Sequence, residues 1–234
     1  MEKALDLGVS IVKFIGLIVL VIIINVLPMR FLLDGQQAPL FLEVPLVLGY
    51  LLVVFWILRI LWKKYQSHLS EMVKSLRFGW RDFGFALLFF LLGRLVAIVG
   101  AFLNLYLSGK TVSVNDAALE MVSNQMNLSH PFFSLLYPVT LAVIAPMVEE
   151  IVFRGFGSVL FFKKPVSWLG AFVTSFIFAI LHVNSWAELP TYLLLGLVIY
   201  GAYARRGSLK DSMAVHVLNN LPTALLFLFS LFIG

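Results

Sequence analysis

The chain alternates between long apolar runs and short polar connectors from one end to the other. A helix needs about 20 mostly apolar residues to cross a bilayer, because each residue adds about 1.5 Å along the axis. The pattern predicts spans over residues 7–27, 40–62, 83–107, 131–162, 168–183, 189–203 and 209–233. We therefore expect an all-α, polytopic transmembrane helix bundle of about seven spans, with six or eight if helices merge or break.

Two connectors carry a pattern of their own. We expect the first span to end at Pro28, because proline interrupts helical hydrogen bonding. Leu119, Val122 and Met126 recur at helical spacing in the longest polar loop and predict a short surface helix there. No linker separates two folding units, so we interpret residues 1–234 as one membrane domain. Its N-terminal spans cover residues 1–107, and its motif-bearing core covers about residues 131–234.

Composition supports an integral membrane protein. Of the 234 residues, 61% are hydrophobic and only 12% are charged, whereas soluble domains carry about 25% charged residues. The chain contains no cysteine, which excludes disulfides, thiolate nucleophiles and thiolate metal ligands. The net charge of +5 does not indicate nucleic-acid binding, because the basic residues flank the predicted spans, where membrane topology explains them.

The distribution of lysine and arginine predicts the orientation. If the N-terminus is cytoplasmic, eleven basic residues lie on the cytoplasmic side: Lys3, Lys63, Lys64, Lys74, Arg77, Arg81, Lys163, Lys164, Arg205, Arg206 and Lys210. Only Arg30 and Lys110 lie on the other side. This positive-inside bias predicts a multi-pass protein, of a bacterial cell membrane by its small size, with its N-terminus in the cytoplasm and its C-terminus outside.

Ionisable residues inside the spans are the candidates for chemistry, since a charge at the bilayer centre costs at least ~2.5–3.5 kcal/mol. Glu149, Glu150 and Arg154 lie together in the fourth span. Residues four apart share a helix face, so Glu150 should neutralise Arg154. Neighbours point about 100° apart, so Glu149 should face the centre of the bundle instead. Pro146 should kink the helix and help to admit water.

Two of the four histidines, His182 and His216, also lie inside spans. His182 shares a helix face with Phe178, and His216 with Asn220. The polar motifs of three successive apolar segments are then Glu149-Glu150-x-x-x-Arg154, Phe178-x-x-x-His182 and His216-x-x-x-Asn220. This ordered set resembles the CAAX protease and bacteriocin-processing family (CPBP, or Abi), intramembrane endopeptidases related to the Ras-converting CAAX protease.

The resemblance implies a role for each motif residue. Glu149 and His182 would activate a water molecule that attacks a peptide carbonyl. His216 and Asn220 would stabilise the oxyanion that develops. Two further positions would support the site without reacting: Glu150 and Arg154. The expected partners are the bilayer and a peptide or lipidated protein substrate, either a CAAX-type tail or a bacterial leader or signalling peptide, with a role in bacteriocin processing or self-immunity.

The residues leave several alternatives open. Glu149, His182 and His216 are also three nitrogen and oxygen ligands that zinc could take, although the H-E-x-x-H signature is missing. The Glu150–Arg154 pair is as compatible with helix packing as with catalysis. A catalytically silent scaffold that regulates other membrane proteins would retain the same fold. A proton-coupled transporter should show inverted repeats, which the sequence lacks.

Four further expectations concern geometry. We expect the site to occupy a water-filled cavity open toward the cytoplasmic side. His182 must lie within about one helical turn of Glu149 in depth, which a break of the fourth span at Gly155 and Gly157 would allow. Glu43 is expected at the membrane interface, and Asn219 is expected to be a packing or capping residue. Arg94 could pair helices or contact a substrate carboxylate.

Overall fold

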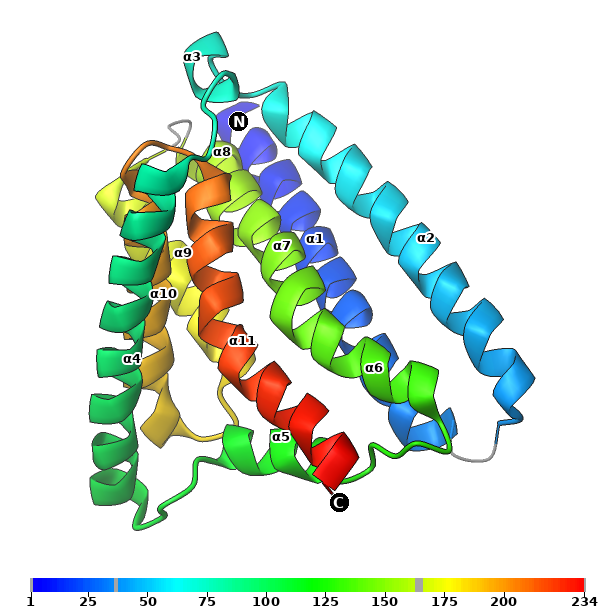
Figure 1. The fold of residues 1–234 in the computed structure, drawn as a ribbon. Helices are drawn as coiled ribbons and strands as arrows, with labels where there is room; N and C mark the ends of the chain where they lie inside the picture. Colours follow the sequence, from blue (N-terminus) through cyan, green and yellow to red (C-terminus); the bar gives the residue numbers. More distant parts are fainter. Residues whose placement is uncertain (1, 36–37, 163–165, 234) are drawn as a thin grey trace.

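The computed structural model describes residues 2–35, 38–162 and 166–233, and all regular structure within them is helical (Figure 1). The first half contains α1 (Glu2–Asp34), α2 (Leu40–Gln66), α3 (Glu71–Lys74), α4 (Trp80–Ser108) and α5 (Val114–Ser123). The second half contains α6 (Pro131–Val139), η2 (Thr140–Ile144), α7 (Ala145–Glu150), η3 (Ile151–Phe156), α8 (Gly157–Phe162), α9 (Trp168–His182), η4 (Trp186–Glu188), α10 (Leu189–Ala204) and α11 (Leu209–Ile233). The predicted all-α fold class is confirmed.

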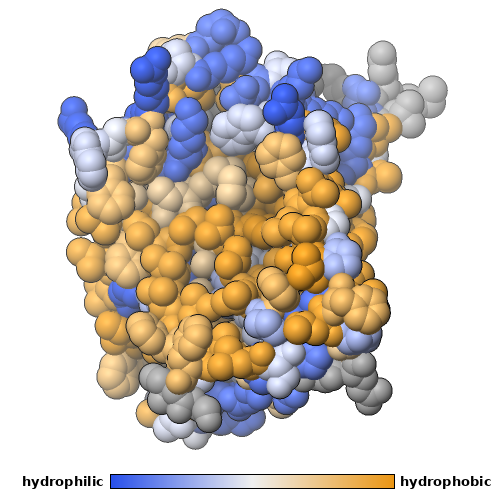
Figure 2. All heavy atoms as spheres, turned by 45° about the vertical axis from the view of Figure 1, so that its right-hand side comes forward, coloured by the Kyte–Doolittle hydropathy of each residue, from blue (hydrophilic) through white to orange (hydrophobic). Residues whose placement is uncertain are grey.

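Six of these helical segments are long and apolar enough to span a membrane. The fifth predicted span is the exception: α9 has 15 residues, or about 22 Å of helix, less than the ~30 Å of a hydrocarbon core. The count of six falls within the expected range. On the face drawn in Figure 2, apolar residues form a band around the middle of the molecule and hydrophilic residues gather at both ends. The chain is thus built as a multi-pass membrane protein.

The helix from Pro131 to Phe162 is the centre of the bundle, and most of it is buried inside the protein. Helices α1 and α2 pack along one side of it, and α11, α10 and α4 lie on the other (Figure 1). Much of α1, α2 and α4 instead exposes apolar side chains outward. The long central helix therefore holds its charged residues away from lipid, as their desolvation cost requires.

Two predictions about helix boundaries were wrong. Helix α1 does not end at Pro28 but continues to Asp34. A proline can remain inside a membrane helix where neighbouring groups compensate for the missing hydrogen bond. The central helix does not break at Gly155 and Gly157 either, because residues 151–156 form a π-helical stretch that joins α7 to α8. The expected position of Phe161 to Val166 at the interface extends into residues 163–165, which lie outside the described residues.

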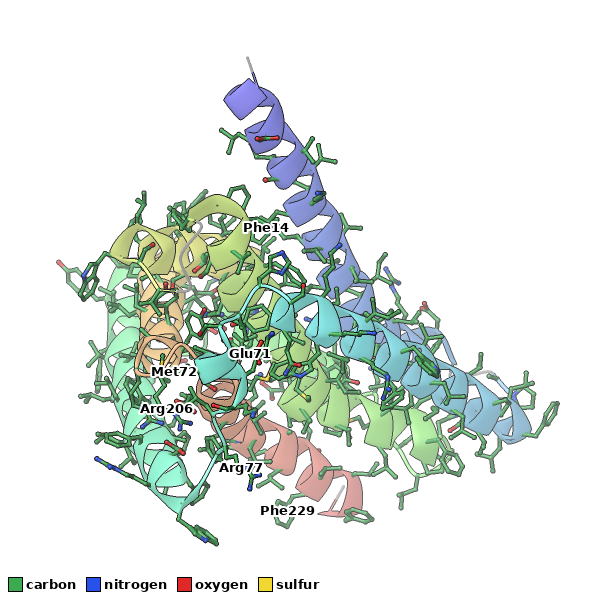
Figure 3. The ribbon with its side chains drawn as sticks, turned by 90° about the horizontal axis from the view of Figure 1, so that it is seen from above. Phe14, Glu71, Met72, Arg77, Arg206 and Phe229 are labelled. Carbon is green, nitrogen blue, oxygen red and sulfur yellow. The ribbon has the colours of Figure 1, made fainter. Side chains whose placement is uncertain are left out.

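A charged cluster fixes α11 at the end of the bundle that carries α3. Arg205 donates hydrogen bonds to Asp82 at 2.5 Å and to Asp211 at 2.8 Å, and Arg206 also binds Asp211. Arg206 also donates to the backbone oxygen of Arg77. Figure 3, which views the molecule from this end, labels Arg206 and Arg77. These contacts join α4 to the α10–α11 turn and so set the register of α11, which carries two motif residues.

The predicted short surface helix is present as α5, although it ends at Ser123, before Met126. Ser113 caps its start, because the Ser113 hydroxyl accepts from the Asp116 amide. Glu43 lies in the first turn of α2 and is fully buried within the protein, and its expected position at the membrane interface stays a prediction. Its carboxylate accepts hydrogen bonds from His130 Nδ1 and from the Phe132 and Phe133 amides. Glu43 therefore caps the start of the central helix, where free amides and the helix dipole favour a negative charge.

Candidate active site

Two π-helical stretches flank Glu149 in the central helix. In the first, the amide of Ala145 donates five residues back, to the Thr140 carbonyl. Pro146 follows and has no amide hydrogen, so the carbonyl of Leu141, five residues before it, loses its donor in this geometry. Asn220 of α11 supplies that donor through its side-chain Nδ2 at 2.9 Å. The predicted disturbance at Pro146 is thus a π-helical turn, and α11 is docked onto it.

Glu150 and Arg154 form a fully buried ion pair, with Arg154 NH1 2.9 Å from Glu150 Oε1. The second guanidinium nitrogen donates to the Gly196 carbonyl at 3.0 Å, and the guanidinium lies 4.7 Å from the ring centre of Phe178. The pairing follows the predicted helix phase. Arg154 thus contacts Glu150 on its own helix, Gly196 on α10 and Phe178 on α9. Through these contacts its side chain joins three helices in the core.

His182 is the last residue of α9, and its ring stacks on that of Phe178 at 4.0 Å between centres. Its Nδ1 lies 2.7 Å from the backbone oxygen of Phe178. A carbonyl can only accept a hydrogen bond, so Nδ1 carries the proton and Nε2 of the neutral ring presents its lone pair. Phe178 therefore fixes both the orientation and the tautomer of His182.

His216 is oriented by a carboxylate. Its Nδ1 lies 2.9 Å from Glu150 Oε1, the same oxygen that accepts from Arg154. By the same reasoning Nδ1 carries a proton, and Nε2 faces the opposite way, toward Glu149. Glu150 thus has two duties, since it neutralises Arg154 and fixes the tautomer of His216.

Glu149 is where these groups converge. Its side chain is almost fully buried, with Oε2 3.5 Å from His182 Nε2 and 3.7 Å from His216 Nε2. Oε2 accepts no hydrogen bond from the described residues. The other oxygen, Oε1, accepts one from Asn25 Nδ2 at 2.6 Å. The structure therefore brings Glu149, His182 and His216 within contact range, and the predicted agreement in depth is confirmed.

These side chains line a cavity of about 570 Å³. Its wall extends to Ser113 and Asp116 around the start of α5 and to Asn184 after α9. Glu188 closes this end, because its buried carboxylate accepts from the amides of Val114, Asn115 and Asn184. In the predicted orientation the α5 end is the outer side, and the expected opening of the cavity toward the cytoplasmic side stays a prediction.

The same three side chains were the candidate zinc ligands. Their contacts of 3.5 and 3.7 Å exceed the about 3.3 Å expected between two ligands of a tetrahedral zinc at ~2.0 Å. Within residues 2–35, 38–162 and 166–233, no group of three or more His, Asp or Glu side chains is placed to hold a metal ion. As arranged, these residues do not fit zinc, and we derive no chemical step through a metal.

Sequence reasoning missed Asn25, which comes from the first span. Asn25 is the one amide side chain between Leu7 and Leu27, and this was the signal that could have found it. The structure also pairs Asn219, expected to pack or cap, with Arg94: Arg94 NH2 donates to Asn219 Oδ1 at 2.8 Å. Both residues line the same cavity as Glu149. The first and third spans therefore contribute to the site, although they carry no motif.

Comparison with known families agrees with the motifs. Residues 131–222 match the family model described as type II CAAX prenyl endopeptidase Rce1-like. The match begins with α6 and ends just after Asn220, so it contains the central helix, α9, α10 and the motif half of α11. It confirms the resemblance expected from the sequence, and it does not include α1 to α5.

The chain is also similar to three curated proteins of Lactococcus lactis subsp. lactis (strain IL1403). It is 38% identical to UPF0177 protein YxdF over 84 residues, 32% identical to UPF0177 protein YaiF over 111, and 35% identical to UPF0177 protein YbdJ over 91. The aligned stretches cover 35%, 46% and 39% of this chain and 44%, 48% and 38% of those proteins. The chain thus matches less than half of the length of each relative. No solved structure matches it significantly.

Proposed function

Because its residues 131–222 carry an Rce1-like domain, we propose that this chain is an intramembrane endopeptidase that uses Glu149 and His182 to activate water. The observation that carries the proposal is the position of Glu149 Oε2, which faces two imidazole Nε2 atoms at the wall of the cavity, on a helix long enough to span a membrane. Burying an ionisable group within a membrane span costs free energy, so its presence there indicates a functional site. Glu150 is paired with Arg154, although its Oε2, like Glu149 Oε2, accepts no hydrogen bond from the described residues. The two carboxylates differ because only Glu149 lines the cavity, where a ligand or water can reach it.

The geometry favours a water molecule as the missing partner. When His182 is in its neutral form, its Nε2 and Glu149 Oε2 are both hydrogen-bond acceptors, and they lie 3.5 Å apart. A water molecule that donates one proton to each would have its oxygen lone pairs directed toward the cavity. Glu149 then removes one proton as the oxygen–carbon bond forms, and it returns that proton to the amine as the carbon–nitrogen bond breaks.

His216 and Asn220 lie one helical turn apart on α11, and both line the cavity, which supports a shared role in binding the oxyanion. The Asn220 amide uses one N–H on the Leu141 carbonyl and keeps a second N–H free. His216 carries its proton on Nδ1, so a donor role for Nε2 requires the doubly protonated ring. We therefore assign the oxyanion first to Asn220, with His216 in support.

The substrate class follows from the resemblance and from the position of the site. We propose a membrane-presented peptide or lipidated protein, either a CAAX-type tail or a bacterial leader or signalling peptide, and a role in bacteriocin processing or self-immunity. Because Glu149, His182 and His216 as arranged do not fit zinc, the proposal includes no metal. Localisation to a bacterial cell membrane, with the N-terminus in the cytoplasm, belongs to the same proposal.

Cleavage of a fluorogenic lipidated peptide by the purified protein tests the proposal. We expect turnover by the wild type and a loss of at least about 100-fold in Glu149→Ala and in His182→Ala. His130→Ala is the matched control, because His130 forms another Glu–His pair, with Glu43, outside the cavity. Equal turnover in all four proteins would overturn the mechanism, and a folded wild type without turnover on any membrane peptide would favour the scaffold. Inhibition by a chelator, reversed by zinc, would favour the metal alternative.

A further inference from the structure

Arg94 is a charged residue in the cavity that the water-activation mechanism does not use. It lies in the middle of α4, fourteen residues from either end of a helix that runs from Trp80 to Ser108. Its guanidinium donates to the neutral Asn219 amide and lies 5.5 Å from the ring centre of Phe90. Its Nε is buried without a hydrogen-bond partner, and among the described residues no acidic side chain pairs with it.

Arg94 differs from Arg154, the buried arginine of the central helix, because Arg154 is paired with a carboxylate. Arg154 has the Glu150 carboxylate at 2.9 Å, whereas Arg94 has only an amide oxygen at 2.8 Å. A guanidinium withdrawn from water into such a place is stabilised best by an anion, and it binds carboxylates with two parallel hydrogen bonds. Because Arg94 lines the cavity, that anion can come from a bound ligand.

The surrounding structure holds Arg94 in this position. Asn219 reaches it because the neighbouring residue on α4 is Gly93, where a Cβ atom would lie 2.7 Å from Asn219 Oδ1. The Asn219 amide in turn donates to the Val215 carbonyl of its own helix at 2.9 Å. Asn219 is three residues from His216, which corresponds to about 4.5 Å along the axis of α11. The residue that holds Arg94 is therefore less than one helical turn from His216.

We propose that Arg94, oriented by Asn219, binds the free C-terminal carboxylate of the peptide substrate. The inference rests on the proposed peptidase function and narrows its substrate class. An extended peptide advances ~3.3–3.6 Å per residue, so a carboxylate at Arg94 leaves only a few residues between the cleaved bond and the chain end. The site then acts on C-terminal tails, and it disfavours internal bonds of leader peptides. Arg94 is thereby a specificity-determining residue.

Two fluorogenic peptides of identical sequence, one ending in a carboxylate and one in an amide, test this role. We expect the wild type to prefer the acid by about 10- to 100-fold in kcat/KM, because a hydrogen bond to a charged group is lost with the amide. The preference should fall to near one in Arg94→Gln. It should persist in Arg59→Gln, the matched control, whose guanidinium also lies over an aromatic ring but outside the cavity.

The outcomes separate this proposal from the peptidase function itself. Equal cleavage of acid and amide by the wild type, or an undiminished preference in Arg94→Gln, would refute the carboxylate site and leave the peptidase intact. If Arg94→Gln does not fold, the comparison of the two peptides on the wild type still decides. If the wild type cleaves neither peptide, the peptidase function fails, and the affinities of the wild type for the two peptides, measured by fluorescence anisotropy, test the carboxylate preference on their own.

Discussion

Neutralising Glu150 should destabilise the fold more than any other single change in the motif. In Glu150→Gln the shape of the side chain is kept, but Arg154 becomes a buried cation without a counter-ion. Breaking a buried ion pair from one side costs about 3–5 kcal/mol. The amide oxygen of the new glutamine can still accept from Arg154 and from His216, so we expect a loss at the lower end of this range, about 3 kcal/mol in the free energy of unfolding.

The assay is thermal unfolding of the purified protein in detergent, followed by tryptophan fluorescence. For a chain of this length 1 kcal/mol corresponds to about 2–4 °C, so the Tm should fall by about 6–12 °C. Glu71→Gln provides the matched control, because Glu71 forms a 2.7 Å pair with Lys74 that is largely exposed. An exposed pair contributes at most about 1 kcal/mol, so this variant should melt close to the wild type.

A double substitution sharpens the test. Arg154→Met alone leaves Glu150 uncompensated, whereas Glu150→Gln combined with Arg154→Met removes both buried charges. The double variant should therefore lose less stability than the two single variants added together, by about 1–3 kcal/mol. If the losses add, or if Glu150→Gln melts no earlier than Glu71→Gln, the ion pair does not hold the core, and the division of roles between the two glutamates is wrong.

Three further variants test other parts of the account. Asn25→Leu removes the donor to Glu149 Oε1 and should lower kcat by about 10- to 100-fold with little change in KM. Asn25→Gln should recover part of the loss, and an unchanged kcat in Asn25→Leu would contradict this positioning role. Glu43→Ala removes the cap of the central helix and should lower the free energy of unfolding by about 2 kcal/mol in the same melting assay, and an unshifted Tm would count against it. An impermeant maleimide should label Met121→Cys on intact cells and Met72→Cys only after permeabilisation, and the reverse pattern would invert the predicted orientation.

Much of the fold was predictable because each membrane-spanning helix corresponds to a long apolar run in the sequence. The bounds of the last span, Leu209 to Ile233, agree with α11, and the fourth span agrees with the central helix. The failures occur where backbone geometry departs from an ideal helix. A π-helical stretch keeps the chain continuous at Gly155, and neither glycine content nor hydropathy distinguishes such a stretch from a break.

The candidate site was predictable as far as helix phase reaches. The four-residue spacing placed Glu150 beside Arg154 and left Glu149 free, as the structure has it. Asn25 and the partner of Arg94 could not be found in this way, because they depend on which helices become neighbours. Glu43 illustrates the same limit: its position near a helix start suggested the interface, but the sequence did not reveal that α2 packs against α6 and buries Glu43 as a cap. Contacts between distant segments require the assembled bundle.

The measurement that tests the central claim most directly is the rate of peptide cleavage by Glu149→Gln. This variant keeps an oxygen for the Asn25 hydrogen bond and buries no new charge, so it should melt close to the wild type. A general base contributes about 10²- to 10⁴-fold, and we expect kcat to fall by at least about 100-fold in the folded variant. Turnover by folded Glu149→Gln within a few-fold of the wild type would contradict the assignment of Glu149 as the group that activates water.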